Sequence, residues 1–592
     1  MSIIRSNFTL IIASFMEDFV HLHVHTHYSI LDGQSKVSHL VDKAINNGMK
    51  GMAITDHGVM YGIKEFSDYC ASVNKKRKKD GLEPFKPILG CEMYVAHHHK
   101  EDKDKSAGDS SGYHLIVLAK NYHGYKNLIK LVSRSWVDGY YYKPRTDRYD
   151  LEKYHEDLIV SSACLGGEIP QKILAGDIKG AREAVEWYHN LFGDDFYLEL
   201  QRHQVTDPSL HANRETYPLQ QKVNKVLTQF AKEYGIKLIC TNDCHFEDKE
   251  TAEAHDHLLC LSTNKDLDDP TRMVYTKQEW FKTREEMNAI FSDIPEALSN
   301  TLEILDKVEV YSIDHGPIMP FFPIPESFGT EEEWHSKFTE EQLYKEFTTD
   351  ENGENPLPKD KADAVIERLG GYDKVYRIKF EADYLAKLAY DGARKRYGDP
   401  IPDDVKEHVK FELHVMKTMG FPGYFLIVQD FINAAREDLG VWVGPGRGSA
   451  AGSVVAYCLG ITKIDPLKYD LLFERFLNPD RVNLPDIDTD FDDDGRGKVL
   501  QWVMDKYGKD NCAHIITYSS MATKNSISDV ARVEKLPLAR SNELKKAIPD
   551  RLPDGMKMNL ANAIKCTPEL REAESSMDPR ERNTIKYARM LE

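Results

Sequence analysis

Long hydrophobic runs are missing from this sequence: none reaches the roughly 18 residues that a membrane helix needs, so no segment is predicted to cross a bilayer. Cysteine is scarce, and the nine that are present form an odd set without framework spacing, which argues against a disulfide scaffold and predicts a reduced, cytoplasmic protein. Positive charge is in the minority, because 77 Lys and Arg face 96 Asp and Glu. The net charge of −19 argues against general attraction to nucleic acid, but it does not fix the local field at a metal site.

The length of 592 residues is too great for one hydrophobic core and predicts about three domains. Residues 1–16 include the short apolar stretch Phe8 to Phe15, which lacks a signal-peptide cleavage pattern, and we interpret them as an extension without function. The basic cluster Lys75 to Lys79 has enough positive charge to attract a phosphate backbone, but a solvated loop is the preferred interpretation.

Acidic residues concentrate in the segment Pro485 to Asp494. On a β-strand, Asp486, Asp488 and Asp490 would project together, while Ile487 and Phe491 would be buried. Neighbouring carboxylates on one rigid strand repel unless a divalent cation lies between them, which predicts a Mg²⁺ platform of the kind used in phosphoryl transfer. A solvated acidic loop and an adventitious Ca²⁺ site are the alternatives.

A glycine-rich loop precedes this segment, from Val443 to Ser453. Glycines let backbone N–H groups approach an anion, and a serine at a helix start directs a hydroxyl and the positive end of the helix dipole toward a phosphate. The loop is not a Walker A motif, and such turns also serve helix packing. Together with the Asp-x-Asp pair, it favours nucleotidyl transfer.

Several longer motifs follow one another between Gly420 and Tyr507. They are Gly-Phe-Pro-Gly-Tyr-Phe-Leu-Ile-Val at 420–428, Gly-Pro-Gly-Arg-Gly-Ser at 444–449, Asp-Pro-Leu at 465–467, Leu-Phe-Glu-Arg-Phe-Leu-Asn-Pro at 472–479 and Pro-Asp-Ile-Asp at 485–488. This stretch resembles the palm of the C-family DNA polymerases, the bacterial replicative DNA polymerase III alpha subunits. The resemblance implies that Asp486 and Asp488 are catalytic carboxylates that bind Mg²⁺. It also implies that Arg447, Gly448 and Ser449 hold the incoming triphosphate, with Arg475 as a further phosphate contact or, equally, a structural ion pair.

A second signature lies near the start of the chain. Residues 19–29 alternate like a strand, so His21, His23, His25 and His27 would share one face, and histidines two apart on a strand can ligate one metal together. Further His, Asp, Glu and Cys residues end apolar runs, as expected at the carboxyl ends of barrel strands, although a single such histidine is more often a core or surface residue. These residues are His57, Glu92, His114, Cys164, Asp243 and His245.

This second pattern resembles the polymerase and histidinol phosphatase (PHP) domain, a distorted (β/α)₇ barrel that opens the alpha subunit in the same family. The resemblance implies a trinuclear site and a metal-dependent 3′→5′ exonuclease. Mixed imidazole, carboxylate and thiolate ligands suit Zn²⁺ or Mn²⁺ better than Mg²⁺ alone. His21, His27, Asp56 and Cys244 are interpreted as supporting or packing residues. The implied ligands are His23, His25, Asp32, His57, Glu92, His114, Cys164, Asp243 and His245.

The predicted fold class is thus α/β multidomain: the PHP barrel over 17–300, an α+β nucleotidyltransferase-like (Pol β-like) palm over 301–515 with an acidic insertion at about 329–383, and a small helical thumb over 516–592. The resemblance implies that the third catalytic carboxylate, the fingers and the clamp-binding parts lie beyond Glu592. The chain is therefore expected to be an N-terminal fragment that does not synthesise DNA alone.

The expected function of the whole protein is template-directed DNA synthesis on primer-template DNA with deoxynucleoside triphosphates, in the bacterial cytoplasm. By resemblance, its partners would be a sliding clamp, a clamp loader and a separate proofreading subunit. The alternatives are a metal-dependent phosphoesterase acting through the barrel alone and a non-catalytic scaffold. The glycine-rich loop argues against the first, and the complete ligand set argues against the second.

Overall fold

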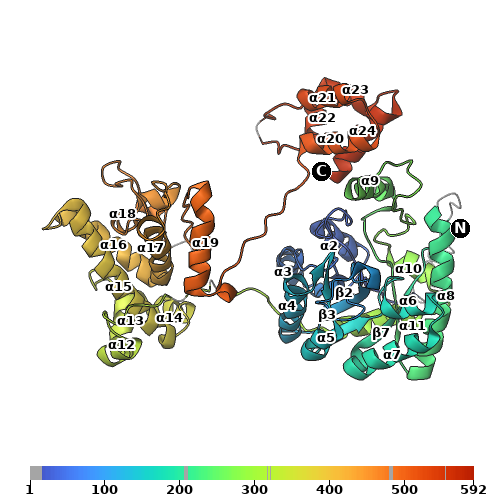
Figure 1. The fold of residues 1–592 in the computed structure, drawn as a ribbon, viewed down its shortest axis with the longest axis horizontal. Helices are drawn as coiled ribbons and strands as arrows, with labels where there is room; N and C mark the ends of the chain where they lie inside the picture. The colour runs from blue at the N-terminus through green and yellow to red at the C-terminus, as the bar shows by residue number, and fades with distance from the viewer. Residues whose placement is uncertain (1–15, 206–210, 316–317, 321, 479–483, 554) are drawn as a thin grey trace. The chain divides into compact units, whose positions relative to one another are not determined.

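The computed structural model describes residues 16–205, 211–315, 318–320, 322–478, 484–553 and 555–592, so the predicted extension lies outside the described residues except for Met16. The chain forms two compact units (Figure 1). The first runs to Ile313 and resumes at Tyr518–Glu592, and the second covers Asp314–Thr517. The predicted domain limits stay predictions.

A curled sheet forms the centre of the first unit. Its order is β4-β5-β2-β3-β6-β7-β8, and β1 pairs with β2. The short strands β1, β6 and β8 are buried throughout, as expected for apolar runs covered on both faces of an α/β sheet. The strands are β1 (Gly51–Ile54), β2 (Lys86–Val95), β3 (Tyr113–Ala119), β4 (Tyr140–Tyr141), β5 (Lys143–Thr146), β6 (Leu158–Ser161), β7 (Phe196–Gln201) and β8 (Leu238–Thr241).

The histidine-rich segment 21–25 lies between β1 and the end of β8. Ala53 N–H donates to the His21 carbonyl at 2.8 Å and Thr55 N–H to the Val24 carbonyl at 2.8 Å, while His25 N–H donates to the Cys244 carbonyl at 2.7 Å. The segment is extended, but it makes only an isolated bridge, Val24 to Cys244, so the prediction of a regular strand is wrong. Its position nevertheless links the two sides of the curled sheet.

The α/β multidomain class is confirmed, but the sheet departs from a regular (β/α) repeat. β3 runs antiparallel to both β2 and β6, whereas β1–β2, β6–β7 and β7–β8 are parallel. The helices of this part are α2 (Val37–Asn46), α3 (Ile63–Lys79), α4 (Tyr122–Val137), α5 (Arg148–Tyr154), α6 (Glu168–Leu174), α7 (Ile178–Phe192), α8 (His211–Tyr234), α9 (Ala252–Thr263), α10 (Arg284–Ile290) and α11 (Glu296–Lys307).

The C-terminal helices pack against α9 (Figure 1). Ala254 of α9 belongs to their hydrophobic core, and His257 Nε2 lies 2.7 Å from Glu534 Oε1. The helical character expected of this segment is present, and its role as a thumb stays a prediction. The helices are α20 (Thr523–Val533), α21 (Leu538–Ala547), α22 (Leu560–Cys566), α23 (Pro568–Glu574) and α24 (Pro579–Leu591).

The second unit is helical, and among its described residues β structure is limited to the isolated bridges Val443–Phe491 and Arg447–Asp488. The α+β palm therefore stays a prediction. The acidic insertion is helical and has its own small core around Leu343 and Phe347, with capping boxes at Thr330 and Thr339. The helices are α12 (Glu331–Lys337), α13 (Glu340–Thr348), α14 (Lys359–Arg368), α15 (Tyr372–Tyr397), α16 (Asp403–Met419), α17 (Pro422–Glu437), α18 (Val454–Cys458) and α19 (Asp493–Tyr507).

Three expectations from composition can be compared with the structure. All nine cysteines are free. In the part of the chain that the structure describes, no helix combines the length and apolar character needed to cross a bilayer. The basic cluster forms the end of α3 rather than a loop, because positive side chains are favoured at the carboxyl end of a helix dipole.

Candidate functional site

The nine predicted metal ligands meet at one end of the curled sheet. His23 and His25 come from the extended segment, and His57 follows β1. Glu92 lies on β2 and His114 on β3. The remaining ligands follow strands or turns, and contacts connect them to this set: Asp32, Cys164, Asp243 and His245.

Within this cluster, three groups each place one ligand atom per residue within 4.8 Å of the others: His25, His57 and His245; His23, His25 and Asp243; and Glu92, His114 and Cys164. Asp32 joins the first group, because its Oδ2 lies 2.9 Å from His57 Nε2. Glu92 connects the groups, with Oε1 2.7 Å from His114 Nδ1 and Oε2 2.5 Å from His57 Nδ1. The arrangement offers three neighbouring positions for cations.

The cluster contains buried polar atoms that lie within ion-pair distance of one another but make no contact with hydrogen-bond geometry among the described residues. They are His23 Nε2, His25 Nε2, His57 Nδ1, Glu92 Oε2 and Asp243 Oδ1. Buried polar atoms in folded proteins are nearly always paired, so a set of five that converge on one space fits bound cations. Imidazole, carboxylate and thiolate together are a ligand set for a transition metal. The residues therefore fit the predicted metal centre.

The electrostatics of the cluster point the same way. Burial opposes protonation of His57, but Glu92 and Asp32 outweigh it and raise the pKa of His57 to about 10. Burial, together with His57 and His245, lowers the pKa of His25 to about 3. Burial raises the pKa of the Cys164 thiol, and nearby Glu92 raises it further. Closely packed imidazoles and carboxylates cannot all be satisfied by protons. A divalent cation satisfies them better, because it interacts with several ligands at once.

A supporting carboxylate, Glu199 on β7, was not predicted from the sequence. Its Oε1 lies 2.8 Å from His23 Nδ1 and accepts from Thr241 Oγ1 at 2.5 Å, while Oε2 accepts from Ser161 Oγ at 2.5 Å. A carboxylate on the far nitrogen of a ligating histidine fixes the tautomer that presents the near nitrogen to a metal. Glu199 thus orients His23, and Ser29 links His25 Nδ1 to Asp56 in a similar way.

Tyr275 is a second residue that the sequence did not single out. Its hydroxyl lies 3.3 Å from both Asp32 Oδ1 and His245 Nε2. Burial raises the pKa of Tyr275 well above its usual value, and Asp32 and Asp243 raise it further, so the hydroxyl remains a donor. Of the predicted flanking residues, His21 binds the Lys282 carbonyl and lies beside Cys244, while His27 binds the Ser35 carbonyl.

We expect Glu199→Gln to weaken metal binding by about 10- to 100-fold, because the amide no longer holds His23 in its ligating tautomer. The measurement is calorimetric titration of the chelator-treated chain with Mn²⁺. Glu303→Gln is the matched control, since Glu303 bonds Tyr197 and Lys237 rather than a candidate ligand. Equal affinity in the two variants would contradict the role of Glu199.

The predicted polymerase residues also meet, in the second unit. Arg447 Nη1 lies 2.9 Å from Asp488 Oδ2, and Arg447 Nε lies 3.2 Å from Asp490 Oδ1. Gly448 has φ +73°, a conformation that favours glycine, and a Cβ there would lie 3.0 Å from Asp488 Oδ2. The glycine-rich loop and the Asp-x-Asp segment therefore form one surface.

The other predicted residues of this site are exposed. Asp486 lies beside Asp488 on the same segment, and Ser449 opens a short 3₁₀ turn, Ser449–Gly452. Arg475 ends a second 3₁₀ turn, Phe473–Arg475, that contacts the first. The Asp-x-Asp segment makes only single bridges, at Asp488 and Phe491. The prediction that it forms a regular strand is therefore wrong.

The prediction that a serine of the glycine-rich loop opens a helix toward a phosphate is also wrong. The serine that caps α18 is the buried Ser453, and its helix start is already occupied by Glu412 of α16. The Glu412 carboxylate accepts from Ser453 Oγ at 2.6 Å, Val454 N–H at 2.8 Å and Val455 N–H at 2.9 Å. The N-terminus of α18 is therefore closed to a phosphate by the carboxyl group of Glu412.

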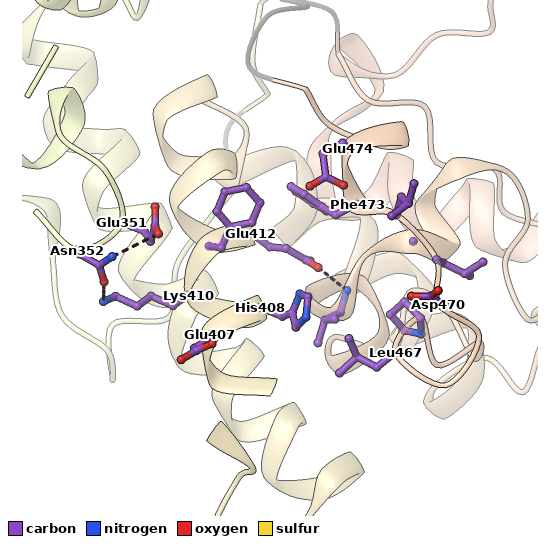
Figure 2. Close-up of a pocket in the computed structure, with 16 residues that line it drawn as sticks. Glu351, Asn352, Glu407, His408, Lys410, Glu412, Leu467, Asp470, Phe473 and Glu474 are labelled. Carbon is purple, nitrogen blue, oxygen red and sulfur yellow. Dashed lines mark hydrogen bonds between the residues drawn. The ribbon is translucent and has the colours of Figure 1, made fainter. Parts of the chain in front are cut away.

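A cavity of about 600 Å³ lies beside this cap (Figure 2). Glu407, Glu412, Asp470 and Glu474 line it, with Leu467 among its apolar residues. None of the predicted polymerase-site residues is part of its described lining. Lys410 and His408 also line the cavity, so its lining is not acidic alone.

We expect the second unit to lose stability as pH rises from about 5 to 8, because burial raises the pKa of Glu412 to about 7 from the ordinary 4.5. An acid whose pKa is raised by folding stabilises the fold fully below its unfolded pKa and loses this contribution as pH rises through the folded pKa. The loss is about 3 kcal/mol. Amide exchange of α18 in urea should show this slope in the wild type, flattened in Glu412→Gln and unchanged in the exposed Glu407→Gln. An equal slope in all three would contradict the assignment.

Comparison with known proteins finds two matching family models and several similar proteins. The family model of the PHP domain matches residues 21–203, and that of the bacterial DNA polymerase III alpha NTPase domain matches residues 383–592. The DNA polymerase III subunit alpha of Thermus aquaticus is 41% identical over 596 residues, which cover 97% of this chain and 46% of that protein. That of Borreliella burgdorferi is 41% identical over 553 residues, covering 93% and 41%.

These curated relatives are more than twice as long as the part that this chain matches. The subunit alpha of Campylobacter jejuni gives the same result, with 38% identity over 588 residues, 98% of this chain and 44% of that protein. The resemblance drawn from the motifs is confirmed over nearly the whole chain. Family models of the PHP domain and of the bacterial DNA polymerase III alpha NTPase domain thus match separate parts of this chain, which is similar over nearly its whole length to bacterial DNA polymerase III alpha subunits.

Proposed function

We propose that this chain contributes to template-directed DNA synthesis as part of a replicative DNA polymerase III alpha subunit, which acts on primer-template DNA and deoxynucleoside triphosphates. The relatives named as that subunit support the assignment. So does the joint surface of Arg447, Gly448 and Asp488, which combines a cation, a backbone open to anions and a carboxylate. The sliding clamp, clamp loader and separate proofreading subunit are proposed as partners of the whole protein.

In this proposal, Asp486 and Asp488 hold Mg²⁺, which would activate the primer 3′-hydroxyl and stabilise charge on the phosphates. Arg447 now pairs with Asp488 and Asp490. Once the carboxylates are occupied, its guanidinium is available to the triphosphate, since guanidinium groups match phosphate oxygens in two-point contacts. Gly448 lets the backbone approach the same phosphates, and Ser449 and Arg475 complete the contact surface.

The PHP cluster is proposed to be a second, metal-dependent site that cleaves phosphodiester bonds, acting as a 3′→5′ exonuclease with up to three Zn²⁺ or Mn²⁺ ions. The observation that carries it is the convergence of buried ligand atoms without hydrogen bonds. Bound ions would supply a hydroxide nucleophile and polarise the phosphate. Tyr275 would donate its proton to an oxygen beside Asp32 and His245.

The experiment measures metal content by mass spectrometry and the degradation of labelled single-stranded DNA, with and without chelator. We expect bound metal and degradation that stops with chelation and returns with Mn²⁺. A chain that holds metal yet degrades no DNA would refute the exonuclease. A phosphoesterase acting through the barrel alone is the second candidate, favoured by the complete ligand set, and it predicts hydrolysis of small phosphoesters without DNA binding.

A further inference from the structure

Exposed aromatic side chains gather where α4 ends and the β4–β5 hairpin begins. The Trp136 and Tyr140 rings are stacked, with centroids 5.3 Å apart and planes 13° apart, although the two side chains remain 40% and 48% exposed. Tyr142 is 59% exposed at the tip of the hairpin, between the paired residues Tyr141 and Lys143. We call Trp136, Tyr140, Tyr142 and Lys143 the aromatic hairpin patch.

The tip residue has an unusual backbone. Tyr142 has φ +62°, a conformation that glycine adopts freely and a bulky side chain adopts at a cost. Its ring contacts Tyr141 edge-on at 4.8 Å, but most of its surface faces solvent, so packing does not explain a tyrosine there. A strained residue with an exposed ring points to use of the ring in contact with another molecule.

The patch adjoins the PHP metal centre. Trp136 Nε1 donates to the Gly58 carbonyl at 2.8 Å, and Gly58 directly follows the ligand His57. A Cβ on Gly58 would lie 2.7 Å from Pro144 of the hairpin. Lys143 Nζ lies 5.2 Å from the Tyr94 ring centroid, and the Tyr94 ring lies 5.1 Å from that of the ligand His114. One layer of side chains therefore separates the patch from the ligands.

The charges at the patch suit a polyanion. Lys143 is exposed, and Lys105 Nζ lies 5.7 Å from the Tyr142 ring. The nearby acid Asp138 lies 3.2 Å from Arg134, which also pairs with Asp150. Aromatic rings beside lysines bind single-stranded nucleic acid, because bases stack on the rings and the lysines attract the phosphates. A duplex offers no free base faces to these rings.

We infer that the aromatic hairpin patch is a stacking surface for single-stranded DNA and holds the strand whose end enters the PHP metal centre. The inference rests on the proposed nuclease function for its purpose, but binding at the patch does not depend on cleavage. It adds a substrate-binding surface to that site and assigns the strained tyrosine a role.

The test is binding of fluorescein-labelled oligothymidylate to the full 592-residue chain in EDTA, followed by anisotropy. We expect Trp136→Ala and Tyr142→Gly each to raise Kd by about 5-fold or more, the range for losing one base–ring stack. Trp136→Phe, which loses the bond to Gly58 but keeps a ring, should retain most of the affinity. Tyr142→Gly relieves the backbone strain, so an unchanged or higher Tm shows that the fold is intact.

Tyr122→Ala is the matched control, because Tyr122 is 41% exposed but lies at the other end of α4, about 20 Å away. Wild-type affinity in Trp136→Ala and Tyr142→Gly would overturn the inference and leave the patch as a protein contact. Absence of oligothymidylate binding by the wild type would also overturn it. So would a loss in Trp136→Phe as large as in Trp136→Ala. Hydrolysis of bis(p-nitrophenyl) phosphate with Mn²⁺ tests the metal centre separately, so failure there refutes the nuclease and leaves the binding result standing.

Discussion

A chain carrying His25→Ala is expected to lose metal and to degrade single-stranded DNA more than about 100-fold more slowly than the wild type. His25 belongs to two of the three ligand groups, with His57 and His245 in one and with His23 and Asp243 in the other. Removal of one imidazole therefore opens two cation positions. The loss should exceed that from Glu199→Gln, which acts only through the orientation of His23.

Metal content by mass spectrometry and DNA degradation should fall together in this variant. His39→Ala is the control, since His39 is 56% exposed and pairs with Glu247 away from the cluster. The wild type should also lose thermal stability on chelation, because Asp32, Glu92 and Asp243 then repel one another. A His25→Ala chain with full metal content and normal degradation would place the activity at another site.

The convergence of the candidate metal ligands was predictable in part, because several of them follow strands. His57 and Asp243 follow the apolar strands β1 and β8, and the carboxyl ends of neighbouring strands meet in space. His114 instead begins the apolar run of β3, and the antiparallel pairing of β3 with β2 brings it to the same edge of the sheet. Glu199 gave no such signal. It lies within the buried run of β7, and only pairing across the sheet places it beside His23 and Thr241.

The proximity of the glycine-rich loop and the Asp-x-Asp pair was also predictable. Glycines around Arg447 and the Asp-x-Asp pair indicated a shared anion and cation site, and the structure places Gly448 against Asp488. The helix start at Ser453 was not predictable, because its partner Glu412 comes from another helix and its burial depends on tertiary packing. The periodicity of a sequence indicates where a helix or strand ends. It does not indicate which residue of another helix will pack against that end.

The aromatic hairpin patch illustrates the same limit. Tyr140, Tyr141 and Tyr142 belong to none of the motifs recognised in the sequence, and aromatic residues favour β structure in general. Only the coordinates reveal that Tyr142 turns the chain with a positive φ and that Trp136 from α4 stacks on Tyr140. A tyrosine with a positive φ goes against the backbone preference of its residue type. Predictions from sequence are expected to fail at such positions.

In a longer protein that contains this chain, we expect Asp488→Asn to reduce primer extension by about 1,000-fold or more. Asp488 pairs with Arg447 and lies next to Gly448, where an added Cβ would be 3.0 Å from its Oδ2, so its charge lies at the junction of the proposed metal and triphosphate positions. Loss of a metal ligand there removes several kcal/mol of transition-state stabilisation. The fold should be unaffected, because the Asp488 side chain is 33% exposed.

Asp490→Asn is the matched control for this prediction. Asp490 also pairs with Arg447, at 3.2 Å, but it is 57% exposed and carries no proposed metal role, so its loss should cost less than about tenfold. Primer extension is measured with labelled primer-template and Mg²⁺, and the metal content of the PHP centre is measured on the same samples to exclude misfolding. If Asp490→Asn were the inactive variant and Asp488→Asn the active one, the catalytic carboxylate would lie two residues further along the segment, and the guanidinium of Arg447 would be paired with a bystander at position 488.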